Sequence, residues 1–129
     1  MRHILFATTL VMACATAAAA GPWEDAVSAY RSRDYPTAAK LFLSLAKQGH
    51  ARAQNNLGMM YRDGLGIPQD FVRAHMWYSV SAVTLSDIDE KETTMKERDG
   101  IESQMTAAQL KKAQAMARRC QETKFKKCD

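Results

Sequence analysis

The sequence has few residues that could carry out chemistry. Of its 129 residues, three are histidine and three are cysteine. Neither an H-x-x-x-H nor a C-x-x-C spacing occurs, so a zinc site is not indicated. There is no G-x-S-x-G nucleophile motif, and the close glycines Gly64 and Gly66 lie before a proline rather than at the start of a helix, as a phosphate-binding loop would require. We predict no catalytic residues, no metal and no cofactor.

Long apolar runs are also absent, except at the N-terminus. A basic start, Met1–His3, precedes the apolar segment Ile4–Ala13, and Thr16–Ala20 supplies the small residues of an A-x-A cleavage site. This order predicts a cleaved secretory signal in residues 1–20, and the apolar segment is too short and too rich in alanine for a membrane-spanning helix. Another interpretation stays open: Val11–Cys14 loosely resembles a lipoprotein cleavage box, which would make Cys14 a lipid anchor, although Met12 fits that box poorly.

The chain has only a small excess of positive charge. The formal net charge is +4, and it falls to +3 when Arg2 leaves with the signal. Basic residues cluster only near the C-terminus, at 111–112, 118–119 and 124–127. The composition favours a solvated basic tail at residues 124–129 over a polyanion site, and we predict no nucleic-acid partner. The globular domain is then predicted to span residues 21–123.

Cysteine is scarce, and two cysteines remain once Cys14 is removed. Export would place Cys120 and Cys128 in a compartment that permits disulfides. On one continuous helix their α-carbons would be about 12 Å apart, whereas a disulfide requires roughly 4 to 7 Å. A Cys120–Cys128 disulfide therefore requires the helix to end near Glu122 and the chain to fold back. Two free thiols or an intermolecular bridge are the alternative.

Apolar residues recur at helical spacing through most of the chain. A first helix contains Trp23 and Tyr30. The second is predicted to be capped by Asp34 and stopped by Gly49, the third to run from about 51 to 62, and the fourth to be capped by Asp70. Gly58, in the middle of the third helix, costs about 1 kcal/mol relative to alanine, which suggests that another helix approaches closely there.

Two further helices are predicted after residue 82. The segment 86–100 is polar and Ser86 can cap it. The last helix begins with a capping box of Thr106 and Gln109 and should reach about Cys120.

The second and fourth helices also match one another in register. A shift of 36 residues places cap on cap, aromatic on aromatic and small residue on small residue, from Asp34 on Asp70 to Ala46 on Ala82. A period of this length is typical of a solenoid of stacked helix pairs.

Residues 53–77 read A-x-x-x-L-G-x-M-Y-x-x-G-x-G-I-P-Q-D-x-x-x-A-x-x-W, which resembles the Sel-one-like repeat family, relatives of the tetratricopeptide repeats. Residues 98–99, 105–109 and 113–118 are similar to the closing segment of small exported bacterial members. The resemblance implies an all-α, short right-handed solenoid of about six helices in three hairpins. It also implies a non-catalytic protein–protein interaction module of the bacterial envelope, periplasmic or secreted, with a protein or peptide as partner.

In related repeats the first helix of each pair lines the concave side. Five residues of the third helix share one such face by spacing, and we predict them as binding residues: Arg52, Asn55, Asn56, Met59 and Arg62. Asparagine and arginine can bond to a peptide backbone, and methionine offers an adaptable apolar contact. An ordinary solvated face is the alternative. The competing function is a cell-wall-modifying enzyme or its accessory factor, which a deep pocket with converging polar groups would favour.

Overall fold

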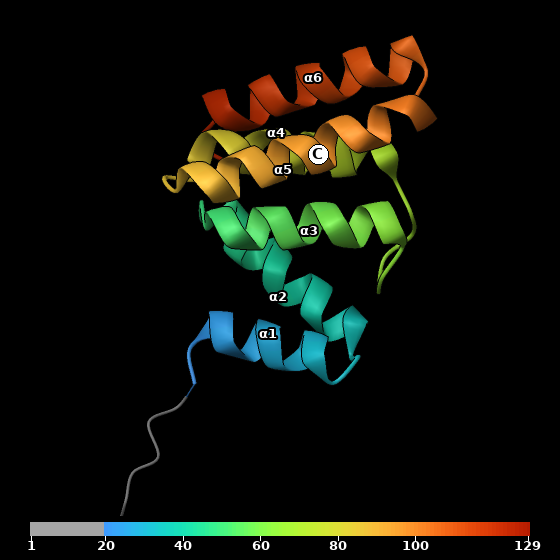
Figure 1. The fold of residues 1–129 in the computed structure, drawn as a ribbon. Helices are drawn as coiled ribbons and strands as arrows, with labels where there is room; N and C mark the ends of the chain where they lie inside the picture. Colours follow the sequence, from blue (N-terminus) through green and yellow to red (C-terminus); the bar gives the residue numbers. More distant parts are fainter. Residues whose placement is uncertain (1–19) are drawn as a thin grey trace, which may run out of the picture.

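A computed structural model describes residues 20–129 as a stack of helices (Figure 1). The elements are α1 (Pro22–Arg31), α2 (Tyr35–Lys47), α3 (Ala51–Asp63), α4 (Phe71–Thr84), α5 (Ile88–Ile101), a short 3-10 turn η1 (Glu102–Gln104) and α6 (Ala107–Glu122). These residues contain no β-strand, so the predicted all-α fold is confirmed. The predicted signal, apart from Ala20, and the alternative anchor Cys14 lie outside the described residues.

Side-chain caps fix where most helices begin. Asp34 accepts a hydrogen bond from the Thr37 amide at 3.4 Å, and Asp70 accepts one from the Arg73 amide at 3.0 Å. The capping box that starts α6 forms as predicted, with Thr106 and Gln109 bonding to each other's backbone amides. These contacts satisfy amides that have no partner inside the helix.

The predicted cap of α5 is wrong by one residue. Asp87, not Ser86, accepts from the Glu90 amide, at 2.9 Å, and α5 begins at Ile88. The reason is tertiary: Leu85 is buried at the end of α4, so the extended connection continues through Ser86 before the next helix can start.

The first four helices pack in chain order along the stack. α1 packs on α2 and α3 on α4 as two hairpins, and α2 packs on α3 to join them. Both α5 and α6 pack on α4, which therefore has neighbours on three sides. This explains why residues 74–78 of α4 are all buried. Within residues 20–129, no helix is both long and apolar enough to cross a bilayer.

Gly58 has the packing role that the sequence predicted. A β-carbon at this position would lie 3.0 Å from the ring of Tyr78 on α4. The missing side chain thus lets α3 and α4 approach closely, and Tyr78 is fully buried in the contact.

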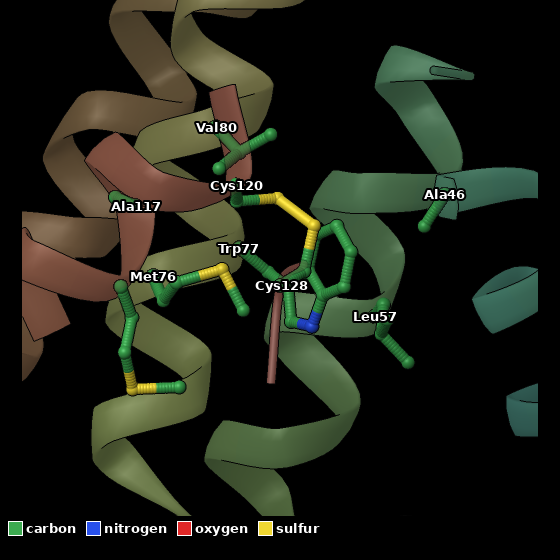
Figure 2. Packing of buried hydrophobic residues seen from close by; sticks show 9 residues of the cluster. Ala46, Leu57, Met76, Trp77, Val80, Ala117, Cys120 and Cys128 are labelled. Atoms are coloured by element: carbon green, nitrogen blue, oxygen red, sulfur yellow. A yellow bond between two sulfur atoms is a disulfide. The ribbon is translucent and has the colours of Figure 1, made fainter. Parts of the chain in front are cut away.

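The chain folds back after α6, and Cys120 and Cys128 form a disulfide with their α-carbons 4.3 Å apart. We call residues 123–129 the hook. Lys124 and Phe125 reverse the chain with positive φ angles of 51° and 67°. Phe125 packs against the core cluster around Trp77. Cys128 is only 2% exposed, and Figure 2 shows its disulfide with Cys120 beside Trp77. The lysines of the hook are exposed, but the segment is held to the body at these two points.

Candidate functional site

A hollow of about 290 Å³ lies among α1, α3 and the start of α5. Its lining combines one aromatic ring, one ion pair and several amides and hydroxyls: Trp23, Arg52, Asn55, Asn56, Leu85, Glu90, Thr93 and Thr94. We call this hollow the groove. Pockets that hold small ligands or peptide side chains usually have this mixture of apolar walls and a few polar groups.

The wall formed by Trp23 is held rigidly. One face of its indole stacks on His50, with ring centroids 4.6 Å apart, and its edge meets Phe42 at 5.7 Å. His50 is itself fixed, because its Nδ1 accepts a hydrogen bond from the Ala53 amide at the start of α3. A ring held in this way can receive a ligand without losing further side-chain entropy.

The two asparagines of the groove differ in what they contact. The amide of Asn55 donates to the Thr94 hydroxyl at 2.8 Å and so links α3 to α5. Asn56 lines the groove, and none of the side-chain hydrogen bonds found within residues 20–129 involves it. Its amide therefore offers both a donor and an acceptor to a ligand.

An ion pair stands at the edge of the groove. The Arg52 guanidinium donates through Nη2 and Nε to the Glu90 carboxylate, at 2.6 and 3.1 Å. The hydrogen bond to Glu90 raises the pKa of Arg52 above its ordinary value. Because the Arg52 side chain is 63% exposed, the pair contributes little to stability and can exchange partners with a ligand.

Arg62 lies farther along α3 in a more open hollow of about 470 Å³. Its guanidinium donates to Asp63 and, at 2.8 Å, to Glu97 of α5. The bond to Asp63 is the main cause of the raised pKa of Arg62. The Tyr78 hydroxyl donates to the same Glu97 oxygen at 2.9 Å, and burial, followed by this bond, raises the pKa of Tyr78.

The five predicted residues are therefore placed unequally. Arg52, Asn55 and Arg62 are bonded to α5, whereas Asn56 is the polar side chain left for a partner. Met59 is half-buried, with its sulfur 4.0 Å from the Tyr30 hydroxyl. The face that they share is thus partly covered by α5.

The sequence prediction missed the residues that complete the groove, which lie on α1, on α5 and in the connection between α4 and α5. One signal was available: Glu90, Thr94 and Glu97 recur at the spacing of one helical face. The sequence analysis considered only that this segment is polar and did not ask which of its polar residues share a face. Each of the three bonds to a side chain of α3.

The buried histidine of α4, His75, contacts a glutamate side chain. His75 on α4 is 2% exposed, and its Nε2 lies 2.9 Å from Glu102 Oε1. In the part of the chain that the structure describes, no group of three or more His, Cys, Asp or Glu side chains could hold a metal ion.

Comparison with protein families gives one match. The family model described as Sel1 repeat matches residues 28–50 and 51–82. The second match coincides with the α3–α4 hairpin, and the first covers the end of α1 and all of α2. Repeats of this kind generally mediate protein–protein interactions and are typically non-catalytic. No curated protein and no solved structure matches the chain.

Proposed function

We propose that this chain, which belongs to the Sel1 repeat family, is a non-catalytic interaction module that holds a segment of another protein in the groove among α1, α3 and α5. The observation that carries the proposal is the groove itself, which is lined by a fixed aromatic ring and by an asparagine whose side chain has no hydrogen bond within residues 20–129. An extended peptide presents alternating amide groups and side chains. Asn56 would bond the backbone, and Trp23 with Leu85 would enclose an apolar side chain.

The ion pair at the edge gives the groove a means of selecting its ligand. A charged side chain of the partner can replace either member of the Arg52–Glu90 pair, and the cost is small because both groups are partly solvated. The groove lining carries one charge of each sign, so it favours a segment without a large net charge.

The bacterial cell envelope is the location that we propose. Two features support it: the signal predicted in residues 1–20 and the buried Cys120–Cys128 disulfide, which an oxidising compartment allows to form. The partner would then be another exported protein. The alternative of a cell-wall-modifying enzyme has no observation in its favour, since Glu90, the carboxylate of the groove, is bonded to Arg52.

Affinity capture tests the proposal. The protein, immobilised and exposed to an envelope extract, should retain a partner, and Asn56→Ala should weaken capture by about tenfold, the loss expected for one hydrogen bond of about 1.4 kcal/mol. Asn56 is chosen over Arg62 because Arg62→Ala would also break the bond to Glu97.

The matched control is Gln114→Ala, which removes an exposed amide from α6, away from the groove. Both variants should melt at the wild-type temperature. If the Asn56 and Gln114 variants capture the partner equally well, the groove is not the binding site.

A further inference from the structure

Four basic residues of α6 lie on one side of the helix. Lys111, Lys112, Arg118 and Arg119 are all exposed and recur at i, i+1, i+7 and i+8, which places them on one side of the helix. Ala113, Ala117 and Cys120 are buried on the opposite side. α6 lies at the end of the stack (Figure 1). By helical spacing Lys111 and Arg118 lie farthest from the buried side, whereas Lys112 and Arg119 border a hollow that they share with the start of α4.

The charge of the chain is concentrated in this region. Residues 107–129 contain seven basic and two acidic side chains, whereas residues 20–106 contain ten basic and twelve acidic ones. The whole positive excess of the described chain thus comes from α6 and the hook. The three lysines of the hook, at 124, 126 and 127, are exposed as well, and we call them and the four α6 cations together the basic face.

The basic face differs from an ordinary solvated surface. On α5, opposite charges are interspersed and paired, as in Lys96–Glu92 at 3.2 Å and Arg98–Asp99 at 2.7 Å. No salt bridge found within residues 20–129 involves Lys111, Lys112 or Arg118. Glu122 shares this side of α6, and Arg119 donates a hydrogen bond to the backbone oxygen of Asp129. These are the two acidic residues of the region, and they leave an excess of five positive charges. A terminal helix needs a polar outer surface for solubility, but such an excess is not required for that.

The side chains of the basic face indicate the kind of partner. Ala115 lies between the two pairs of α6 cations, and the large apolar side chains exposed in the described residues, at 83, 88 and 95, are all on other elements. Such a face has nothing to insert into a pocket or into acyl chains, and it can recognise a partner only by negative charge.

We propose that the basic face of α6 and the hook adsorbs to the surface of a bilayer that contains anionic phospholipids. Each lysine or arginine near such a surface strengthens the attraction, and seven are available to share it. None of the residues that line the groove lies on α6 or in the hook, so adsorption would leave the groove open to a protein partner.

Vesicle co-sedimentation tests this proposal. The protein is purified from the cells that express it, and mass spectrometry identifies its N-terminal residue. It is then mixed with vesicles of phosphatidylcholine alone or of phosphatidylcholine with phosphatidylglycerol. Binding is expected only to the anionic vesicles and should fall as salt is raised. The variant K111Q/R118Q should bind roughly 25-fold more weakly, about fivefold for each charge removed.

The control variant R31Q/R33Q removes two exposed cations from the α1 end of the stack and changes the net charge by the same amount. It should bind the anionic vesicles almost as well as the wild type. Equal loss in the two variants would mean that only net charge matters and would overturn the proposal. Equal binding to neutral vesicles would overturn it too, as would retention on poly-glutamate without vesicle binding, which would assign the face to an acidic polypeptide.

Discussion

At the scale of single residues, Gly58 and Tyr78 decide how closely α3 lies against α4. The Tyr78 ring is fully buried and its hydroxyl is held by Glu97, so the ring cannot move aside without losing a hydrogen bond. An alanine at position 58 would gain about 1 kcal/mol of helix propensity. Overpacking a buried site costs about 1 to 3 kcal/mol, so the packing cost should exceed the gain.

We therefore predict that Gly58→Ala lowers the free energy of unfolding by about 1 kcal/mol, as measured by urea denaturation. The matched control is Gly100→Ala, since a β-carbon there meets nothing within 4 Å. This control should raise the unfolding free energy by up to about 1 kcal/mol. A Gly58 variant as stable as the Gly100 variant would show that the two helices can separate freely.

At the scale of a single element, α4 depends on Asp70 for its start. This carboxylate accepts from the Arg73 amide and pairs with the Arg73 guanidinium at 2.8 Å. Burial acts to raise the pKa of Asp70, but the hydrogen bonds from Arg73 and its charge outweigh burial, and the pKa falls below its ordinary value of 3.8. A lowered pKa means that ionised Asp70 stabilises the fold above the pKa of the unfolded chain, and that this stabilisation disappears as the pH falls through the lowered value.

Asp70→Asn isolates the charge, because asparagine is also a good helix cap. At pH 7 the variant should be less stable than the wild type by about 1 kcal/mol or less, the size of a partly exposed ion pair. The difference should shrink as the pH is lowered below about 4 and vanish once Asp70 is protonated. Denaturation curves recorded between pH 2 and pH 7 measure it; a difference that stays constant with pH would mean that the charge is unimportant.

At the scale of the whole molecule, the hook joins helices that are far apart in the sequence. Its disulfide starts from α6, and Cys128 lies beside Trp77 of α4 (Figure 2). Phe125 reaches the turn between α2 and α3, where a β-carbon on Gly49 would lie 2.9 Å from its ring. The hook thus covers the core cluster around Trp77, and the disulfide keeps it there.

We predict that Cys120→Ala/Cys128→Ala lowers the free energy of unfolding by about 2 to 3 kcal/mol, the loop-closure contribution of a disulfide that spans eight residues. Wild-type protein treated with a reductant should behave like the double variant. Phe125→Ala, which keeps the disulfide, separates packing from the covalent link. If reduction leaves the denaturation midpoint unchanged, the disulfide of the hook does not stabilise the fold.

The sequence alone determined the elements and their repetition. Asp34, Asp70 and the Thr106–Gln109 box are local signals, because a cap needs only the next three residues. The 36-residue register placed the two matched repeats, and Gly58 pointed to the close helix contact. Each of these inferences depends on the type and spacing of residues along the chain and not on how the helices are rotated against one another, which is why the structure confirms them.

Only the tertiary structure decided how the predicted binding face is used. The side chains of Arg52, Asn55 and Arg62 have the same spacing whether they face solvent or another helix, and the rotation of α5 pairs them with Glu90, Thr94 and Glu97. The cysteines are a similar case, since their distance depends on where α6 ends. Polar contacts between separate helices require both position and rotation, and neither follows from the periodicity of one segment.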